Sequence, residues 1–158
     1  MRKFSVFISV LLILSCFLSV SAAAECPVDP VNTLSENWQV STQSDTLCWM
    51  IADLTVNGSS AECYGSFEGI DEVYHVALKI TLEKKKTVLL WSSWEEVTHW
   101  SMNFYKNFGE MTRSLEDLSS GTYRTKAEFT VYYREEGADL NDFSQEVVTT
   151  YSAEETVA

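Results

Sequence analysis

The side chains that could act as nucleophiles or metal ligands are few in this chain, which has four cysteines and two histidines. A reactive cysteine needs a neighbouring base that favours the thiolate, and no histidine lies near a cysteine in the sequence. His75 and His99 are too few to supply the four ligands of a typical structural zinc site. We therefore expect no enzyme, no catalytic residue, no metal site and no cofactor.

Carboxylate pairs occur at three places that the pattern assigns to loops, where solvation accounts for them: Asp71-Glu72, Glu95-Glu96 and Glu135-Glu136. The densest group of oxygen ligands comprises Glu135, Glu136, Asp139, Asn141 and Asp142. An acidic loop can supply several of the oxygens that calcium requires. The spacing lacks the Asp-x-Asn-x-Asp-Gly pattern of a dedicated calcium loop, so we interpret it as a solvated loop, with calcium binding as the alternative.

Aromatic side chains are abundant, with five Trp, seven Tyr and eight Phe, and some of them must fill a core. Trp49 alternates with Met50 and therefore points to the opposite face of its predicted strand. Trp91 and Trp94 differ by three positions, so both cannot point inward without a bulge. We name Trp49, Trp91 and Trp94 as possible contacts for a protein or a sugar; the alternative is that other segments cover these rings.

The N-terminus has the order of a secretory signal peptide. Arg2 and Lys3 precede an apolar run at 4–20, and small residues follow, with Ala22 and Ala24 at the positions that a signal peptidase reads. We predict a signal peptide at 1–24, secretion, and no transmembrane segment in the mature chain. The stretch before Cys16 resembles a bacterial lipobox, so a lipid anchor on Cys16 is the alternative.

The charge balance excludes whole classes of partner. The chain has 11 Lys+Arg against 23 Asp+Glu, a formal net charge of −12. Phosphates require a basic face, so we expect neither a nucleic acid nor an anionic membrane as partner, which leaves an unknown protein or glycan. A hydrophobic content of 46% over 158 residues indicates one domain with a packed core.

From Thr46 onward the hydrophobic pattern has a period of two, which is typical of strands. We predict an all-β fold, an antiparallel two-sheet immunoglobulin-like sandwich of about seven strands at 46–152. Residues 25–45 form a partly mobile N-terminal extension in this interpretation, and 153–158 an acidic tail. We place a turn at Lys84-Lys85-Lys86, separate strands at 88–94 and around 100–104, and a connecting segment at 111–120. The inward rows are Tyr74, Val76, Leu78, Ile80 and Leu82, and Tyr123, Thr125, Ala127, Phe129 and Val131.

The first hairpin has a specific predicted register. Asn57 and Gly58 both tolerate positive φ and suit a two-residue type I′ turn. That turn would place Leu54 opposite Ala61, Ala52 opposite Cys63, and Met50 opposite Gly65. Cys48 would then lie about 13 Å from the residue facing Cys63, beyond the roughly 7 Å that a disulfide spans. Cys26 could pair with either cysteine, or all three could be unpaired.

Leu118-Ser119-Ser120-Gly121-Thr122-Tyr123 resembles the tyrosine corner that opens strand F of immunoglobulin-like domains. Other short motifs are Ala61-Glu62-Cys63, Leu-x-Lys-Lys at 82–85, Ser93-Trp94, Gly-Thr-Tyr-Arg at 121–124 and Glu-x-x-Thr at 146–149. With them the chain resembles small uncharacterised secreted β-sandwich proteins of Gram-positive bacteria. The resemblance implies an immunoglobulin or fibronectin type III-like fold and export, and it implies no activity.

The resulting hypothesis is a secreted, non-enzymatic binding module at the cell surface or outside the cell. One alternative is a small secreted hydrolase or calcium-dependent glycan-binding protein, with its site in the loops at 95–96 and 135–142. Another is a passive structural component of an envelope or matrix.

Overall fold

A computed structural model describes residues 39–41, 44–135, 137–139 and 142–158. The predicted signal peptide, Cys16 and Cys26 lie outside the described residues. Within the described part the strands are β1 Gln39–Ser41, β2 Leu47–Asn57, β3 Ser60–Gly69, β4 Val73–Val88, β5 Trp91–Phe104, β6 Phe108–Leu115, β7 Gly121–Tyr133, β8 Ser144–Tyr151 and β9 Glu155–Val157.

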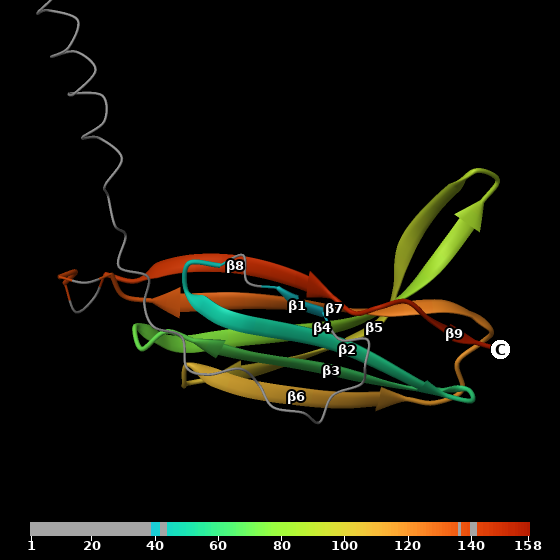
Figure 1. Cartoon of the computed structure of the whole chain (residues 1–158), viewed down its shortest axis with the longest axis horizontal. Coiled ribbons are helices and arrows are strands. Elements are labelled where there is room, and N and C mark those ends of the chain that lie inside the picture. Colours follow the sequence, from blue (N-terminus) through green and yellow to red (C-terminus); the bar gives the residue numbers. More distant parts are fainter. Residues whose placement is uncertain (1–38, 42–43, 136, 140–141) are drawn as a thin grey trace, which may run out of the picture.

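The strands form two antiparallel sheets that pack face to face as a sandwich (Figure 1). One sheet has the order β1-β2-β3-β6, and the other has the order β5-β4-β7-β8, with β9 paired to the start of β7. The inward rows of both sheets make one buried apolar cluster. The predicted all-β two-sheet sandwich is therefore confirmed.

The central strands β4 and β7 bury the side chains that the alternation assigned to the core. On β7, Tyr123, Thr125, Ala127, Phe129 and Val131 are all buried, as predicted. On β4 the inward row is confirmed except at its start, where Tyr74 is 40% exposed. A register shift between Val73 and His75 puts Val73 inside instead, because a bulge reverses the alternation at one residue.

The predicted register of the β2–β3 hairpin is wrong, because the turn lies one residue further along the chain than predicted. Leu54 pairs with Cys63, Ala52 with Gly65, and Asn57 with Ser60, so the turn residues are Gly58 and Ser59. Gly58 has a φ of 62°, and Ser59 has no positive φ, which fits a type II′ turn with Gly first. The pairing moves by two residues, which preserves the faces, so Met50, Ala52 and Leu54 still point into the core.

The outer face of β2 is more covered than the alternation predicted. Ile51 and Asp53 are buried there, and Trp49 is half-buried, whereas Thr55 is exposed. Period two assigns side chains to a face, but it does not say whether that face meets solvent.

Four other predicted assignments are corrected. Residues 84–86 lie inside β4 and form no turn. The strand predicted at 88–94 contains the end of β4, the turn at 89–90 and the start of β5, and β5 then continues through the second predicted strand at 100–104. Beyond the core, β4 and β5 pair only with each other, so their side chains follow no apolar alternation. The connecting segment at 111–120 begins as the edge strand β6, and the tail after Ser152 contains β9, whose Val157 is buried.

The tyrosine corner is present. Tyr123, at the start of β7, is buried and donates a hydrogen bond from its hydroxyl to the backbone oxygen of Ser119 at 2.6 Å. Lys84 donates to the Ser119 hydroxyl and to the Ser120 oxygen, at 2.7 and 2.8 Å, and so holds the same crossing from β4. The segment between β6 and β7 is therefore fixed at the position where the chain changes sheets.

A pair of substitutions on β2 tests this arrangement. Leu54→Asp should unfold the domain, because it removes a core side chain and buries a carboxylate, at a combined cost of several kcal/mol. Thr55→Asp, one residue away and exposed, should change the free energy of unfolding by no more than about 0.5 kcal/mol. Urea unfolding followed by circular dichroism measures both, and equal damage from the two changes would contradict the assigned faces.

Candidate functional site

The most unusual surface feature is a two-stranded arm, defined here as residues 85–94. β7 pairs with β4 only as far as Lys84, and beyond that residue β4 pairs with β5 alone. Figure 1 shows this hairpin projecting from one end of the sandwich. The arm therefore places its end away from the body of the protein.

The end of the arm is apolar. Its tip, residues 88–91, consists of Val88, Leu89, Leu90 and Trp91, whose exposed fractions are 58, 93, 96 and 82%. Scattered exposed apolar residues are normal on proteins, but four consecutive large ones on a projecting hairpin form a patch. On other proteins, exposed apolar patches often lie where another molecule makes contact.

The backbone of the tip supports the same interpretation. Leu89 has a φ of 56°, in the left-handed region that disfavours residues with a side chain. The first turn residue of the β2–β3 hairpin also requires a positive φ, and there the residue is Gly58, with a φ of 62°. The Leu89 side chain is almost fully exposed and adds a backbone strain that glycine would avoid, so folding does not explain it.

The base of the arm is braced by charge and stacking. The Arg124 guanidinium lies between the rings of Trp94 and Tyr151, 4.1 Å from each centroid, and its Nε donates to Glu83 at 2.7 Å. Lys85 pairs with Glu154 at 2.9 Å, and Lys86 pairs with Glu95 at 3.3 Å. A two-stranded hairpin is marginal by itself, so these contacts help to hold the arm's direction.

The three tryptophans named as possible ligand contacts lie in three different environments. Trp49 is on the outer face of β2, half-buried, and donates from Nε1 to Glu68 at 2.9 Å. Trp91 is at the exposed tip, and Trp94 is half-buried under Arg124. The structure does not bring them together, and the opposite parity of Trp91 and Trp94 is retained along β5.

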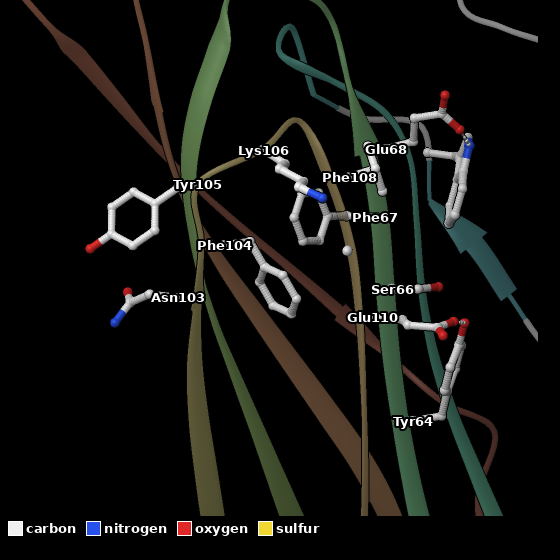
Figure 2. A pocket seen from close by; sticks show the side chains of 12 residues that line it. Tyr64, Ser66, Phe67, Glu68, Asn103, Phe104, Tyr105, Lys106, Phe108 and Glu110 are labelled. Atoms are coloured by element: carbon white, nitrogen blue, oxygen red, sulfur yellow. Dashed lines mark hydrogen bonds between the residues drawn. The ribbon is translucent and has the colours of Figure 1, made fainter.

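A groove of about 830 Å³ lies at the other end of the sandwich (Figure 2). Its apolar floor contains Phe67 and Phe104, whose rings meet edge to face at 5.4 Å. Gly109 permits this packing, because a Cβ there would lie 2.4 Å from the Phe104 ring. Phe108 is exposed at the rim with the Lys106 ammonium 5.2 Å from its ring centroid.

Two carboxylates orient the aromatic rings of the groove. Glu68 accepts from Trp49, and Glu110 accepts from the Tyr64 hydroxyl at 3.1 Å. Burial raises the pKa of Tyr64, and the neighbouring Ser66 hydroxyl opposes that shift; the hydrogen bond to Glu110 and the charges of Glu110 and Asp53 raise the pKa further. The Tyr64 hydroxyl therefore stays a hydrogen-bond donor at neutral pH.

A second aromatic group lies on the outer face of the β5-β4-β7-β8 sheet. The His75 ring is stacked between Tyr105 and Tyr132, with centroid distances of 4.8 and 4.9 Å. Its Nε2 donates to Oδ1 of Asn103 at 3.1 Å. The other histidine, His99, contacts Glu96 at 2.7 Å, and the hydrogen bond from His99 lowers the pKa of Glu96.

The two acidic regions named for a hydrolase or a calcium site lie at opposite ends of one sheet. Glu95 and Glu96 are on β5 near the arm, whereas Glu135 follows the far end of β7. Glu136 and Asn141 of the predicted calcium loop lie outside the described residues. In the described part of the chain, no group of three or more His, Cys, Asp or Glu side chains is placed to hold a metal ion.

The cysteines follow the prediction in part. Cys48 is disulfide-bonded, and Cys63 is buried and free, so the two do not pair with each other, as predicted. The alternative that all three cysteines are unpaired is wrong. The predictions for Cys26 fall outside the described residues. Among the described residues no helix is long and apolar enough to cross a membrane.

The tip is the feature that the sequence interpretation missed. The lysine run predicts a turn at 84–86, whereas the turn lies at Leu89 and Leu90. The available signal was the continuous apolar run Val88-Leu89-Leu90-Trp91, which breaks the period-two alternation.

Comparison with protein-family models, with curated proteins and with solved structures gave no significant match.

The buried thiol gives a pH prediction. Burial, with a smaller effect of the Glu62 charge, raises the pKa of Cys63 from 9.0 to about 11, although a hydrogen bond with Thr125 opposes the shift. Between these values the unfolded chain ionises at Cys63 while the folded chain does not. Stability from this group is therefore complete below pH 9 and is lost as the pH rises towards 11, by about 3 kcal/mol.

The measurement is urea unfolding of the protein and of Cys63→Ala from pH 8 to pH 11. The variant lacks the ionisable group, so its stability should fall less steeply, and the two curves should converge at high pH. Parallel curves would show that the Cys63 thiol ionises equally in the folded and unfolded states.

Proposed function

We propose that this protein is a secreted, non-enzymatic interaction module that attaches to a surface outside the cell through the tip of its β4–β5 arm. The observation that carries the proposal is the exposure of four consecutive apolar side chains, Val88 to Trp91, on a hairpin that projects from the body. The strained φ of Leu89 supports it, because strain that persists without a folding benefit points to function.

Export is supported by the N-terminal sequence. The basic pair at Arg2 and Lys3, the apolar run at 4–20 and the small residues at 21–24 have the order of a signal peptide. The disulfide at Cys48 is consistent with an oxidising compartment outside the cytosol. In this proposal the protein is exported across the membrane, and it attaches to a surface outside the cell.

We also propose that the sandwich has an immunoglobulin or fibronectin type III-like architecture. Without the short strands β1 and β9, the sheets have the orders β2-β3-β6 and β5-β4-β7-β8. These orders correspond to A-B-E and C′-C-F-G in the lettering of immunoglobulin-like folds. The tyrosine corner of Tyr123, at the start of β7, occupies the place that it has at strand F and supports this assignment.

A double substitution at the tip tests the attachment. In the cells that make the protein, it should be recovered with the cell envelope, whereas Leu89→Gly combined with Leu90→Ser should be recovered from the medium. The tip contributes nothing to the core, and glycine suits the φ of Leu89, so the variant should be at least as stable. Immunoblots of the two fractions, together with a melting curve, measure both effects.

Val147→Ser is the matched control. Val147 is 60% exposed on β8, remote from the arm, so this variant should remain with the envelope. Recovery of the unaltered protein only from the medium, or envelope recovery of the tip variant at the normal level, would contradict the proposal.

A second candidate function is glycan binding in the groove, favoured by its size and its lining. Trp49, Tyr64 and Phe108 offer ring faces for sugar stacking, while Glu68 and Glu110 offer hydrogen-bond acceptors. A cleft of this volume with oriented polar groups suits a small ligand. The two carboxylates are engaged by Trp49 and Tyr64, which favours binding over hydrolysis.

Titration of soluble cell-wall oligosaccharides, followed by tryptophan fluorescence, tests the second candidate. Trp49→Ala should weaken binding by about 2 kcal/mol or more, as for a stacking anchor. Trp91→Ala should bind normally, because Trp91 lies at the other end of the molecule. If Trp91→Ala lost oligosaccharide binding and Trp49→Ala retained it, the groove would be excluded as the glycan-binding site.

A further inference from the structure

We infer that the tip inserts into the interfacial region of a lipid bilayer whose headgroups carry no net charge. This inference rests on the proposed function, since it names the surface to which the arm attaches. It starts from the observation that the apolar tip, residues 88–91, has a polar collar immediately behind it, defined as the pair Thr87 and Ser92.

The depth of the apolar end fits the boundary between headgroups and acyl chains. Val88 pairs with Trp91, and the next pair behind them is Thr87 with Ser92, both hydroxyl-bearing. The apolar part thus extends for two residues on each strand, about 7 Å at the rise of a strand. Interfacial elements bury their apolar faces by roughly 5–10 Å, so the collar would lie at the level of the headgroups.

The composition of the tip also suits this boundary. Trp91 is 82% exposed beside the two leucines, and tryptophan is enriched where headgroups meet acyl chains. Turn backbone groups without a partner are costly in the hydrocarbon centre of a bilayer but meet water at the interface. A shallow insertion is therefore compatible with a hairpin turn, whereas deep insertion is not.

A protein partner fits the tip less well because the contact is small. Specific protein interfaces involve about 20–30 residues from each partner, or roughly 800 Å² on each side. The apolar tip has four residues on a hairpin that projects from the body (Figure 1), and the pair immediately behind it, Thr87 and Ser92, is polar. A bilayer needs no complementary rim, because apolar side chains gain by leaving water wherever they enter it.

The charge of the protein selects the type of lipid. The chain carries a formal net charge of −12, and Lys85 and Lys86, behind the collar, are already paired with Glu154 and Glu95. An anionic bilayer would repel the body of the protein at low ionic strength, and salt would screen that repulsion. Neutral headgroups, such as those of phosphatidylcholine, impose no such cost.

The experiment is vesicle flotation with the purified mature protein. The protein should float with phosphatidylcholine vesicles, and its tryptophan emission should shift to the blue as Trp91 leaves water. Adding phosphatidylglycerol at low salt should weaken binding, and raising the salt concentration should restore it.

The combined Leu89→Gly and Leu90→Ser variant should bind phosphatidylcholine vesicles at least about tenfold more weakly, because burial of even one leucine side chain provides roughly that factor. Val147→Ser should bind like the unaltered protein, and the melting curves should show all three proteins folded. Equal binding by the tip variant, or stronger binding to the anionic vesicles, would overturn the inference.

Failure of this inference can be distinguished from failure of the proposed function. If the envelope retains the protein through its tip but phosphatidylcholine vesicles do not bind it, the bilayer is excluded and attachment through the tip stands. If sedimentation equilibrium shows tip-dependent self-association without vesicle binding, a second copy replaces the bilayer. If neither the envelope nor the vesicles bind the protein, both the inference and the proposed function fail.

Discussion

The pairing of β4 with β7 is the interaction on which the rest of the structure depends. Along this pair, Val76, Leu78, Ile80 and Leu82 face Val131, Phe129, Ala127 and Thr125, and all eight residues are buried. The same strand β4 then continues past Lys84, where β7 no longer accompanies it, and becomes one side of the arm. A single strand is thus anchored in the core at one end and presents an exposed end at the other, so the core fixes where the tip can reach.

The two turns that join paired strands at that end of the molecule place very different residues at a similar backbone position. In the β2–β3 turn, a glycine takes the positive φ and no large side chain is exposed. In the β4–β5 turn, Leu89 takes a similar φ and holds an apolar side chain in water. The positive φ of Leu89 and the exposure of its apolar side chain both cost free energy in the isolated protein. Contact with an apolar environment would recover the cost of the exposure. In the proposed function, exchange of Leu89 for glycine would therefore separate stability from attachment.

The two candidate contact regions lie at opposite ends of the sandwich and have opposite shapes. The tip is convex, has no carboxylate, and begins at Val88. The groove is concave, holds Glu68 and Glu110, and reaches Phe104, which pairs with Val76 near the start of β4. The braced arm base lies between them, where Arg124 is held between Trp94 and Tyr151. An attachment at the tip would leave the groove directed away from the surface, free for a second ligand.

The sequence by itself determined the features that follow from alternation and from local chemistry. It predicted the all-β sandwich, the inward row of β7, most of the inward row of β4, the tyrosine corner and the absence of a Cys48–Cys63 bond. These depend on period two and on short spacings, which a strand reports directly. Tertiary structure decided what alternation cannot encode: the bulge that exposes Tyr74, the position of the turn at Gly58-Ser59, the burial of Ile51 and Asp53, and the length of β4. The lysines at 84–86 resemble a turn in sequence, yet they extend a strand, because the pairing of β4 with β5 continues where the core has ended. Whether Leu89, Leu90 and Trp91 fill a core or meet solvent depends on which strands accompany them, and only the folded chain decides that.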